Sequence, residues 1–398
     1  MSLSIAIFGN TNNSSLFLAK GMKELGHEVR LILNRKEALH RPESCHPIWR
    51  DAYPEWIVDC SKMTDEDIAF QTEEMDKSVH YLTHGIDLAI LNDTGPALAG
   101  YLNIPYVVFL TGSDLSYWAN FNMLNLRTAQ WAPEFKKSPQ GRQYIMRFID
   151  LVARQRDGIL GANLVCYPQR GTIPSGDLLL DEIGVLNSCR FMLFSCNLTD
   201  LKPRKLNDNR RLIILNGARI NFKLESHPEL SAIDFKGTDI LLEGFAQYIK
   251  AGGSGELRMV RKGWDIDAAL ALIEELGIQC HIKWLDEMPL EQFHHEMIAA
   301  DLICDQFGTS LPGGVTLDAY ALGRVVMANL RKDIFRKRFP KPLPGFDVET
   351  PSEVAQALGR LEHNRRLLID MGDQSRYYAE TYLSTSSMCS ELLSRVIS

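Results

Sequence analysis

The chain has 398 residues, of which 45% are hydrophobic and 23% are charged, and its formal net charge is −7. This length exceeds that of one typical hydrophobic core and predicts two domains. The composition is typical of a soluble globular protein, and the negative charge balance argues against a nucleic-acid partner.

The cysteine pattern and the lack of targeting signals predict a cytoplasmic protein. The eight cysteines form no CxxC pair, and none stands at metal-ligand spacing from a histidine. We therefore expect reduced thiols and no metal. The N-terminal stretch runs straight into a strand, without the basic start and long apolar core of a signal peptide. No apolar run approaches the roughly 18 residues of a membrane span.

The first half of the chain opens with a strand–helix–strand pattern. Residues 4–8 are apolar, the apolar residues of 16–25 recur at helical spacing, and residues 28–33 form a second strand pattern. This order predicts a parallel sheet with helices on both faces. The GxGxxG fingerprint of dinucleotide-binding proteins is absent. Gly9 stands alone after the first strand, where ligand binding and tight packing explain it equally well.

Two acidic residues follow later strands of the first half. Residues 64–84 predict one polar helix, and the apolar stretches 88–91 and 105–110 predict strands that end before Asp93 and Asp114. Ligands of open parallel sheets bind at the carboxyl ends of the strands, so both carboxylates are site candidates. Each also suits the N-cap of a helix, and this alternative is equally good.

Residues 127–156 are basic and rich in aromatic side chains. They hold seven Lys or Arg against two acidic residues, and large apolar side chains lie between them: Trp131, Phe135, Tyr144, Met146, Phe148 and Ile149. A basic amphipathic helix can lie on an anionic membrane surface or accept an anionic substrate. A solvated helix packed by its apolar side is the simpler alternative. Peripheral contact with the inner membrane surface is one expectation for this segment.

The second half begins after the polar stretch 198–211, which is the expected domain boundary. Strand patterns at 212–215, 256–260 and 281–285 alternate with helical patterns, among them 266–276, and this predicts a second doubly wound unit. Its most informative stretch is 301–327. There a short apolar strand is followed by a loop with three glycines and one proline, a helix and another apolar strand.

The glycine loop predicts a phosphate site. Gly313 and Gly314 open the helix, so bare N–H groups and the positive end of the helix dipole meet at one point. Asp318, about one helical turn further on, can face the same point and accept hydrogen bonds from sugar hydroxyls. A single glycine loop is a weak signal, and an ordinary crossover with glycines for tight packing is the alternative.

Three cations follow strands or precede a helix at the same expected edge of the sheet. Arg219 comes after strand 212–215, Lys236 stands before a helix, and Lys262 follows strand 256–260. Two positive charges together with a helix N-terminus suit a diphosphate. Each cation alone is explained as a surface residue, and only their shared position favours a common site.

With these residues the second half resembles the nucleotide-sugar-binding domain of retaining glycosyltransferases with the GT-B fold, most of all glycosyltransferase family 4. The resemblance covers about residues 210–330. It rests on five segments: Gly217 to Arg219, Lys236 to Leu242, Ala300 to Leu302, Gly313 to Ala319, and Gly323 to Val326. The first half matches only in outline, through its opening strand and the LTGSDL segment that contains Asp114.

The resemblance implies a role for each candidate residue. In the family, an Arg and a Lys hold the donor diphosphate, a glycine loop takes phosphate oxygens, and an acidic residue binds the nucleotide ribose. Arg219 and Lys236 would then act in catalysis on the leaving diphosphate, and Asp114 would lie on the acceptor side near the reacting carbon. The implied donor-binding residues are Gly9, Lys262, Ser310, Gly313, Gly314, Val315 and Asp318.

The chain departs from the family in its acidic motif. The family has a Glu, seven residues and a second Glu, whereas Ser310 and Asp318 stand at these positions here. Asp318 keeps the carboxylate on a side chain one methylene shorter, and Ser310 removes a charge near the donor sugar. Asp305, just before the loop, can bring an acidic group back to that sugar. The departures indicate either an altered donor choice or a non-catalytic copy.

The sequence therefore predicts an α/β protein with two Rossmann-like doubly wound domains that face each other across a cleft. We expect an acceptor-binding domain at 1–205, a nucleotide-sugar-binding domain at 206–371, and a C-terminal helix within 372–398 that crosses back to the first. The expected reaction moves a sugar from a nucleoside diphosphate sugar to a hydroxyl of a glycan, lipid-linked or other acceptor, with retention and without a metal or cofactor. The alternatives are a non-catalytic nucleotide-sugar-binding protein and a sugar-nucleotide epimerase on the same fold.

Overall fold

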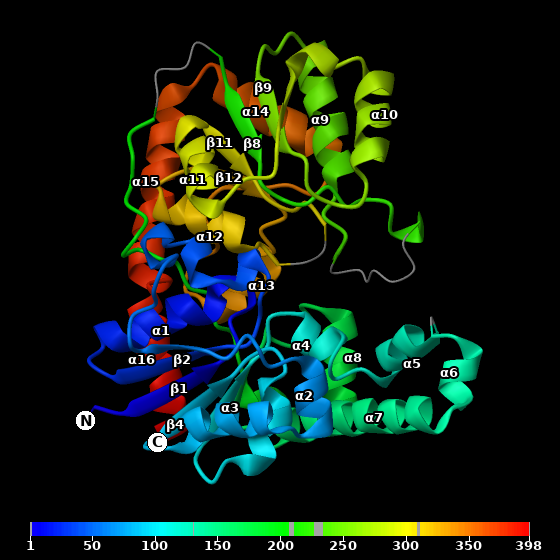
Figure 1. The fold of residues 1–398 in the computed structure, drawn as a ribbon. Coiled ribbons are helices and arrows are strands. Elements are labelled where there is room, and N and C mark those ends of the chain that lie inside the picture. The colour runs from blue at the N-terminus through cyan, green and yellow to red at the C-terminus, as the bar shows by residue number, and fades with distance from the viewer. Residues whose placement is uncertain (1, 130, 207–210, 227–233, 309–310, 398) are drawn as a thin grey trace. The chain divides into compact units, whose positions relative to one another are not determined.

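The computed structural model forms two compact units, and each is described by itself (Figure 1). One unit runs to Leu193 and includes the C-terminal segment from Thr385, and the other runs from Phe194 to Ser384. The structure describes residues 2–129, 131–206, 211–226, 234–308 and 311–397.

The first unit is built on a parallel seven-stranded sheet with the strand order β3-β2-β1-β4-β5-β6-β7. The sequence predicted this class of sheet from its βαβ opening, because parallel strands need crossover helices. Strand β1 is buried along most of its length, as a central strand covered on both faces must be. The strands are β1 (Ser4–Phe8), β2 (Glu28–Leu33), β3 (Ile57–Asp59), β4 (Leu88–Leu91), β5 (Tyr106–Phe109), β6 (Leu164–Cys166) and β7 (Arg190–Phe191).

Nine α-helices of the described residues belong to this unit. The last of them, α16, brings the C-terminal segment into the first unit, where Cys389 and Leu392 are fully buried in one core with Leu16 of α1. The helices are α1 (Ser14–Glu24), α2 (Asp65–Phe70), α3 (Glu73–Thr83), α4 (Ser113–Ser116), α5 (Phe121–Ala129), α6 (Pro133–Lys137), α7 (Pro139–Leu160), α8 (Pro174–Ile183) and α16 (Thr385–Ile397).

One local prediction in this unit was wrong. The expected single helix at 64–84 is two helices, because Gln71 adopts the left-handed conformation with a φ of 56° and ends α2. The segment after β4 is a 3-10 helix, Gly95–Tyr101. The break at Gln71 does not move the carboxyl ends of β1, β4 and β5, where the candidate residues of this unit lie.

The second unit is a parallel six-stranded sheet with the order β10-β9-β8-β11-β12-β13. Helices α9 and α10 pack side by side, and α14 packs along α9 (Figure 1). The strands are β8 (Ile213–Asn216), β9 (Glu256–Val260), β10 (Ile282–Leu285), β11 (Leu302–Cys304), β12 (Val325–Ala328) and β13 (Phe346–Asp347). The helices are α9 (Thr238–Lys250), α10 (Ile266–Leu276), α11 (Leu290–Ala299), α12 (Gly314–Ala321), α13 (Lys332–Arg338), α14 (Pro351–Glu362) and α15 (Arg365–Tyr382).

The bounds of the two units differ from the expected 1–205 and 206–371. The stretch after Leu193 belongs to the second unit, because the backbone N–H of Cys196 donates to the Leu383 oxygen at 2.7 Å. The guanidinium of Arg324 also donates to the Arg204 oxygen at 2.6 Å. Helix α15 stays with the second unit, so the part of 372–398 that packs on the first unit is α16 alone.

Candidate functional site

Two loops of the second unit meet where the order of its strands reverses. Strand β8 has β9 on one side and β11 on the other. The chain adds β9 and β10 on the first side and then crosses over to add β11, β12 and β13 on the second side. Ligands of open α/β sheets bind at the carboxyl ends of the strands at such a switch point. The loop after β8 carries Arg219, and the loop after β11 carries Asp305 and Gln306. Both loops therefore start at one edge of the sheet.

The carboxylate of Asp305 organises the start of α12. Its Oδ2 accepts hydrogen bonds from the Gly313 N–H at 2.7 Å and from the Thr316 hydroxyl at 2.7 Å, and the Thr316 N–H lies at 3.3 Å. The carboxylate thus occupies two donors of the helix N-terminus. Among the residues that the structure describes, nothing accepts from the N–H groups of Gly314 and Val315, so these two donors are open to an anion.

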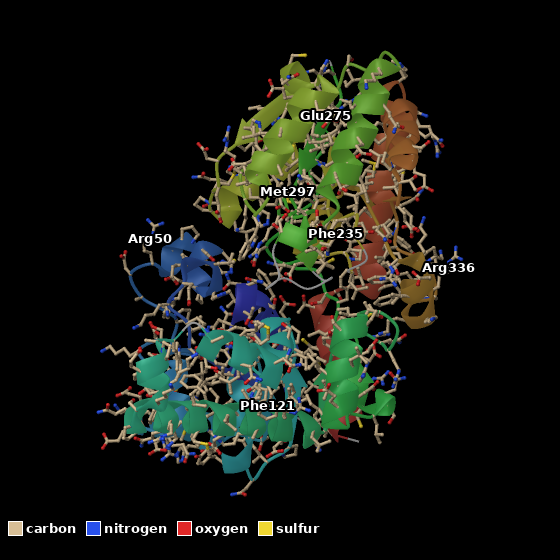
Figure 2. All side chains as sticks on the ribbon, turned by 90° about the vertical axis from the view of Figure 1, so that its right-hand side faces the viewer. Arg50, Phe121, Phe235, Glu275, Met297 and Arg336 are labelled. Carbon is tan, nitrogen blue, oxygen red and sulfur yellow. The ribbon has the colours of Figure 1, made fainter. Side chains whose placement is uncertain are left out.

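Lys236 is held over the loop that follows β11. Its ammonium donates to Oε1 of Gln306 at 2.7 Å, and the Phe307 N–H donates to the Lys236 carbonyl at 2.8 Å. Phe235, which directly precedes Lys236, is labelled in Figure 2. Gly237 follows with a φ of 65°, and a Cβ there would lie 3.0 Å from the Gly308 nitrogen, so this close approach requires glycine.

The ammonium of Lys236 is in an environment that disfavours its charge. Burial lowers the pKa of Lys236, the nearby charge of Arg219 lowers it further, and the carboxylates of Asp305 and Asp234 oppose the shift. A bound anion would relieve this imbalance, because an opposite charge favours the protonated lysine. Arg219 itself is exposed. The structure therefore brings Arg219, Lys236 and the start of α12 to one place.

Asp318 lies one turn into α12, and its partner is on a neighbouring helix. Nε2 of His294, from α11, lies 2.9 Å from Oδ2 of Asp318. Lys262 is engaged elsewhere, because its ammonium pairs with Glu287 at 2.7 Å. Ser310 lies outside the described residues, so its predicted place near the donor sugar stays a prediction.

Gly9 in the first unit is placed by packing. Its φ is 83°, and a Cβ there would lie 2.7 Å from the carbonyl oxygen of Asn92, which follows β4. No other residue fits this position without a shift of the backbone. The loop after β1 is also tied to β4 by the Thr11 N–H, which donates to the Asn92 side chain at 3.0 Å. A donor-binding role for Gly9 stays a prediction.

Asp114, in α4, is fully buried and organises the loop that follows β5. Its carboxylate accepts from the N–H groups of Thr111, Gly112 and Leu115 at 2.7–3.0 Å and from the Asn92 amide at 3.1 Å. Burial raises the pKa of Asp114 to about 6, and the Thr111 and Gly112 hydrogen bonds oppose that rise. Both carboxylate oxygens are engaged, so Asp114 shapes this loop, and its predicted place on the acceptor side stays a prediction.

A polar cluster at this edge of the first unit centres on the buried Asp93. Arg35, after β2, donates to both oxygens of Asp93, at 2.5 and 2.8 Å, and to Asp65 at 2.9 Å. Asn34 donates to the same carboxylate at 2.7 Å, and Asp93 has a φ of 57°. The sequence pointed to Asp93 but missed Arg35 and Asn34, although all three follow strands and the strand-end rule applies to each.

The basic segment 127–156 is three helices, α5 to α7, in the described residues. Its aromatic side chains largely pack on one another: Trp131 contacts Phe135 and Tyr144, and Tyr144 stacks on Phe148 at 5.6 Å. This agrees with the simpler alternative of a packed helix. Part of the apolar set nevertheless stays outside, because Met146 is 63% exposed.

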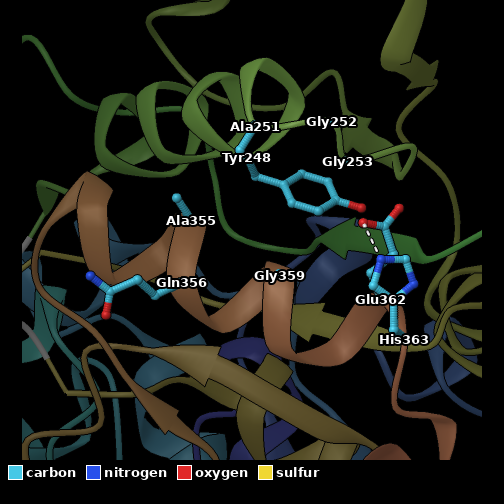
Figure 3. Close-up of a pocket in the computed structure, with 9 residues that line it drawn as sticks. All are labelled: Tyr248, Ala251, Gly252, Gly253, Ala355, Gln356, Gly359, Glu362 and His363. Atoms are coloured by element: carbon cyan, nitrogen blue, oxygen red, sulfur yellow. Dashed lines mark ion pairs between the residues drawn. The ribbon is translucent and has the colours of Figure 1, made fainter.

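A separate pocket of about 430 Å³ lies at the other end of α9, between its last turn and α14 (Figure 3). Five of its lining residues are glycine or alanine, and the side chains of Tyr248, Gln356, Glu362 and His363 supply the polar groups. Glu362 also ties the loop before β9, because it accepts from the Ser254 N–H at 2.7 Å. None of the nine described residues that line this pocket is a lysine or arginine, so its chemistry does not favour a diphosphate.

The described residues contain neither a group of three or more His, Cys, Asp and Glu side chains that could hold a metal ion nor a helix long and apolar enough to cross a membrane.

Comparison with solved structures identifies the fold. The Anabaena protein HepE, solved in complex with UDP and glucose, matches over 98% of both chains with a TM-score of 0.61 at 15% identity. A glycosyltransferase from Rickettsia africae has a TM-score of 0.61 at 15% identity, over 99% of this chain and 97% of its own. Sucrose-phosphate synthase from Thermosynechococcus elongatus has a TM-score of 0.59 at 12% identity, over 98% and 97%.

The chain therefore has the GT-B fold of these glycosyltransferases, as the sequence predicted. No protein-family model and no curated protein sequence matches it. Family 4 is compatible with the structural neighbours. At these identities the likeness establishes the architecture alone.

Proposed function

We propose that the protein is a retaining glycosyltransferase that moves a sugar from a nucleoside diphosphate sugar to a hydroxyl acceptor. The observation that carries the proposal is the meeting of Arg219, Lys236 and the open N–H groups of Gly314 and Val315 at the β8–β11 switch point. Two cations and a helix N-terminus form a site for a diphosphate. Neighbours with the same fold were solved with UDP and UDP-glucose, which is consistent with such a donor.

The proposed mechanism is electrostatic. As the bond between the sugar and the diphosphate breaks, negative charge grows on the leaving phosphate, and Arg219 and Lys236 stabilise it together with the amides of Gly314 and Val315. Asp318 binds the ribose and holds the donor in place. Cationic side chains and the helix dipole perform the charge stabilisation for which other transferases use a metal ion. The acceptor hydroxyl approaches the face of the sugar from which the diphosphate leaves.

A panel of nucleotide sugars tests the donor site. The melting temperature of the purified protein is measured with UDP-, GDP-, ADP- and CDP-sugars, beside the Arg219→Ala variant. A ligand at 100 times its dissociation constant should add about 2.7 kcal/mol to the free energy of unfolding. We expect one base to stabilise the protein and the variant to lose this response. If none of the four stabilises the wild type, the donor site is refuted.

Turnover assays with the same nucleotide sugars separate the alternative functions. A non-catalytic nucleotide-sugar-binding protein is favoured by one departure, the Ser310 that replaces an acidic residue. Such a protein would be stabilised by a nucleotide sugar yet show no turnover with any acceptor. An epimerase would convert the bound donor without an acceptor. Release of nucleoside diphosphate that depends on an added acceptor supports the transferase.

The proposed function includes contact of helices α6 and α7 with a membrane surface. On α6 and α7, the exposed apolar side chains of Phe135, Met146 and Ile149 are accompanied by the exposed cations Lys137 and Arg142. Apolar side chains that insert between lipids, with cations that meet anionic headgroups, fit a peripheral contact with an anionic bilayer. A lipid-linked acceptor and a position at the inner membrane surface are consistent with this arrangement.

Vesicle binding tests this surface. We expect the protein to sediment with vesicles that contain phosphatidylglycerol at low salt and to stay in solution with phosphatidylcholine alone, because added salt screens the attraction. The double variant Met146→Ser/Ile149→Ser should bind these vesicles about tenfold or more weakly, since burying one such side chain contributes about 1.5 kcal/mol or more. Leu178→Ser on α8 is the matched control, because Leu178 is 67% exposed in the same unit. No binding of the wild type at low salt contradicts the proposal.

A further inference from the structure

Asp318 of α12 has one side-chain partner among the described residues, His294 of α11. Nε2 of the histidine lies 2.9 Å from Oδ2 of the carboxylate. An ionised carboxylate only accepts hydrogen bonds, so Nε2 carries the hydrogen and donates it. The other oxygen, Oδ1, takes no hydrogen bond from the residues that the structure describes. The pair therefore leaves one oxygen engaged and one available.

Helix α11 places His294 beside the candidate donor site. Its neighbour Phe293 packs on the loop after β8, because a Cβ on Gly217 would lie 2.8 Å from the Phe293 ring and 2.7 Å from Val315. Met297, labelled in Figure 2, is fully buried and anchors the inner side of the helix. Phe293 and His294 therefore adjoin the segments that carry the cation Arg219 and the open amide of Val315.

The pair is only partly exposed, with 17% of the His294 side chain and 20% of the Asp318 side chain accessible. A partly buried carboxylate without a partner is free to rotate about its last bond, and either oxygen can then face the solvent. The hydrogen bond from His294 removes this freedom, because it holds Oδ2 on the side of α11. Oδ1 is then presented in one orientation. This matters more for an aspartate than for a glutamate, whose longer side chain reaches further.

We propose that His294 is a positioning residue that fixes Asp318 for the hydroxyls of the donor ribose. The inference rests on the proposed function and adds a residue that no sequence motif indicates. A diol needs acceptors in fixed positions, and a site built to hydrogen-bond hydroxyls rejects analogues that lack them. His294 compensates for the missing methylene of Asp318 by holding the shorter carboxylate in the binding orientation.

Binding of ribose and dideoxyribose nucleotides tests the role of His294. Dissociation constants of UDP, GDP, ADP and CDP and of their 2′,3′-dideoxy counterparts are measured for the wild type, His294→Ala, His294→Gln and His295→Ala. We expect His294→Ala to bind the preferred ribonucleotide about tenfold more weakly, which corresponds to about 1.4 kcal/mol. Its affinity for the dideoxy counterpart should not change. His295→Ala is the matched control, because His295 is the exposed neighbour on the same helix.

Each outcome decides one part of the inference. His294→Gln keeps an N–H donor and should recover most of the ribose preference, whereas a merely structural residue would not show this pattern. Asp318→Ala should lose the same preference, and the double variant should lose no more, since the two side chains act as one unit. Equal weakening of ribose and dideoxyribose binding in His294→Ala, or no weakening, overturns the role of His294 while the donor site stands. If the wild type binds none of the eight nucleotides, the proposed function fails and the inference falls with it.

Discussion

Replacing Arg219 with alanine is expected to lower turnover by about 10²–10³-fold, the typical loss when one group that stabilises transition-state charge is removed. Arg219 lies just past the carboxyl end of β8, and its charge is near enough to act on the pKa of Lys236. In the proposed reaction it meets the leaving diphosphate as negative charge develops. Initial rates with the donor chosen by the nucleotide panel measure the effect.

The fold of Arg219→Ala should be intact. The residue is exposed, and surface substitutions of this kind usually change the free energy of unfolding by no more than about 0.5 kcal/mol. Arg336→Ala is the matched control, because Arg336 is an exposed arginine of the same unit, on α13 (Figure 2). Arg219→Lys keeps the charge but loses the bidentate guanidinium, so its turnover should lie between that of the wild type and that of Arg219→Ala. Near-normal turnover of Arg219→Ala would remove this residue from the mechanism.

The fold was predictable where a glycine marks the end of an apolar or periodic segment. Strand 256–260 and helix 266–276 have the bounds that the sequence indicates, and Gly277 ends the helix in the left-handed conformation. The break within 64–84 was not predictable in this way, because Gln71 takes a positive φ without a glycine or proline to signal it. Strand β3 was missed because it has three residues and is defined by its pairing with β2.

The candidate site was predictable only in its local parts. Arg219, Lys236 and the glycine loop follow from the rule that ligands meet the carboxyl ends of strands, which needs no knowledge of distant contacts. Their partners could not be found in that way. Gln306 is 70 residues from the Lys236 that it holds, and His294 is 24 residues from Asp318. Such contacts arise from tertiary packing, which no spacing in the chain reveals.

Asp305 has a structural role that the sequence did not indicate, and its expected place near the donor sugar stays a prediction. The sequence offered it as a substitute acid near the donor sugar. In the structure its Oδ2 accepts from Gly313 and Thr316, so the carboxylate serves the start of α12. A short acidic side chain before a glycine loop is drawn to the helix N-terminus by the same N–H groups that attract a phosphate. In the proposed function, the N–H groups of Gly314 and Val315 are the donors of this helix start that meet the diphosphate.

Replacing Lys236 with methionine is expected to lower turnover by about 10²–10³-fold and to leave the protein as stable as before, or more stable. Burial lowers the pKa of Lys236, so folding disfavours its charged form. Methionine fills similar space without a charge to desolvate. Lys250→Met, at the exposed end of α9, is the matched control and should change neither quantity. A large fall in melting temperature for Lys236→Met would instead make Lys236 a structural residue.

The pH dependence of stability and donor affinity in the wild type is a second test of the role of Lys236. The ordinary pKa of lysine is 10.5, and that of Lys236 in the folded chain is lower. Below the folded-state pKa both states are protonated, and the unfavourable charge burial is fully present. As the pH rises from there toward 10.5, the unfolded chain binds more protons, so this contribution to stability becomes less unfavourable. Over the same range the neutral amine loses its attraction for the diphosphate, so donor affinity falls. As the pH rises over this range, the contribution of Lys236 to stability should therefore increase while donor affinity falls. Lys236→Met should lack both contributions, because methionine has no proton to lose.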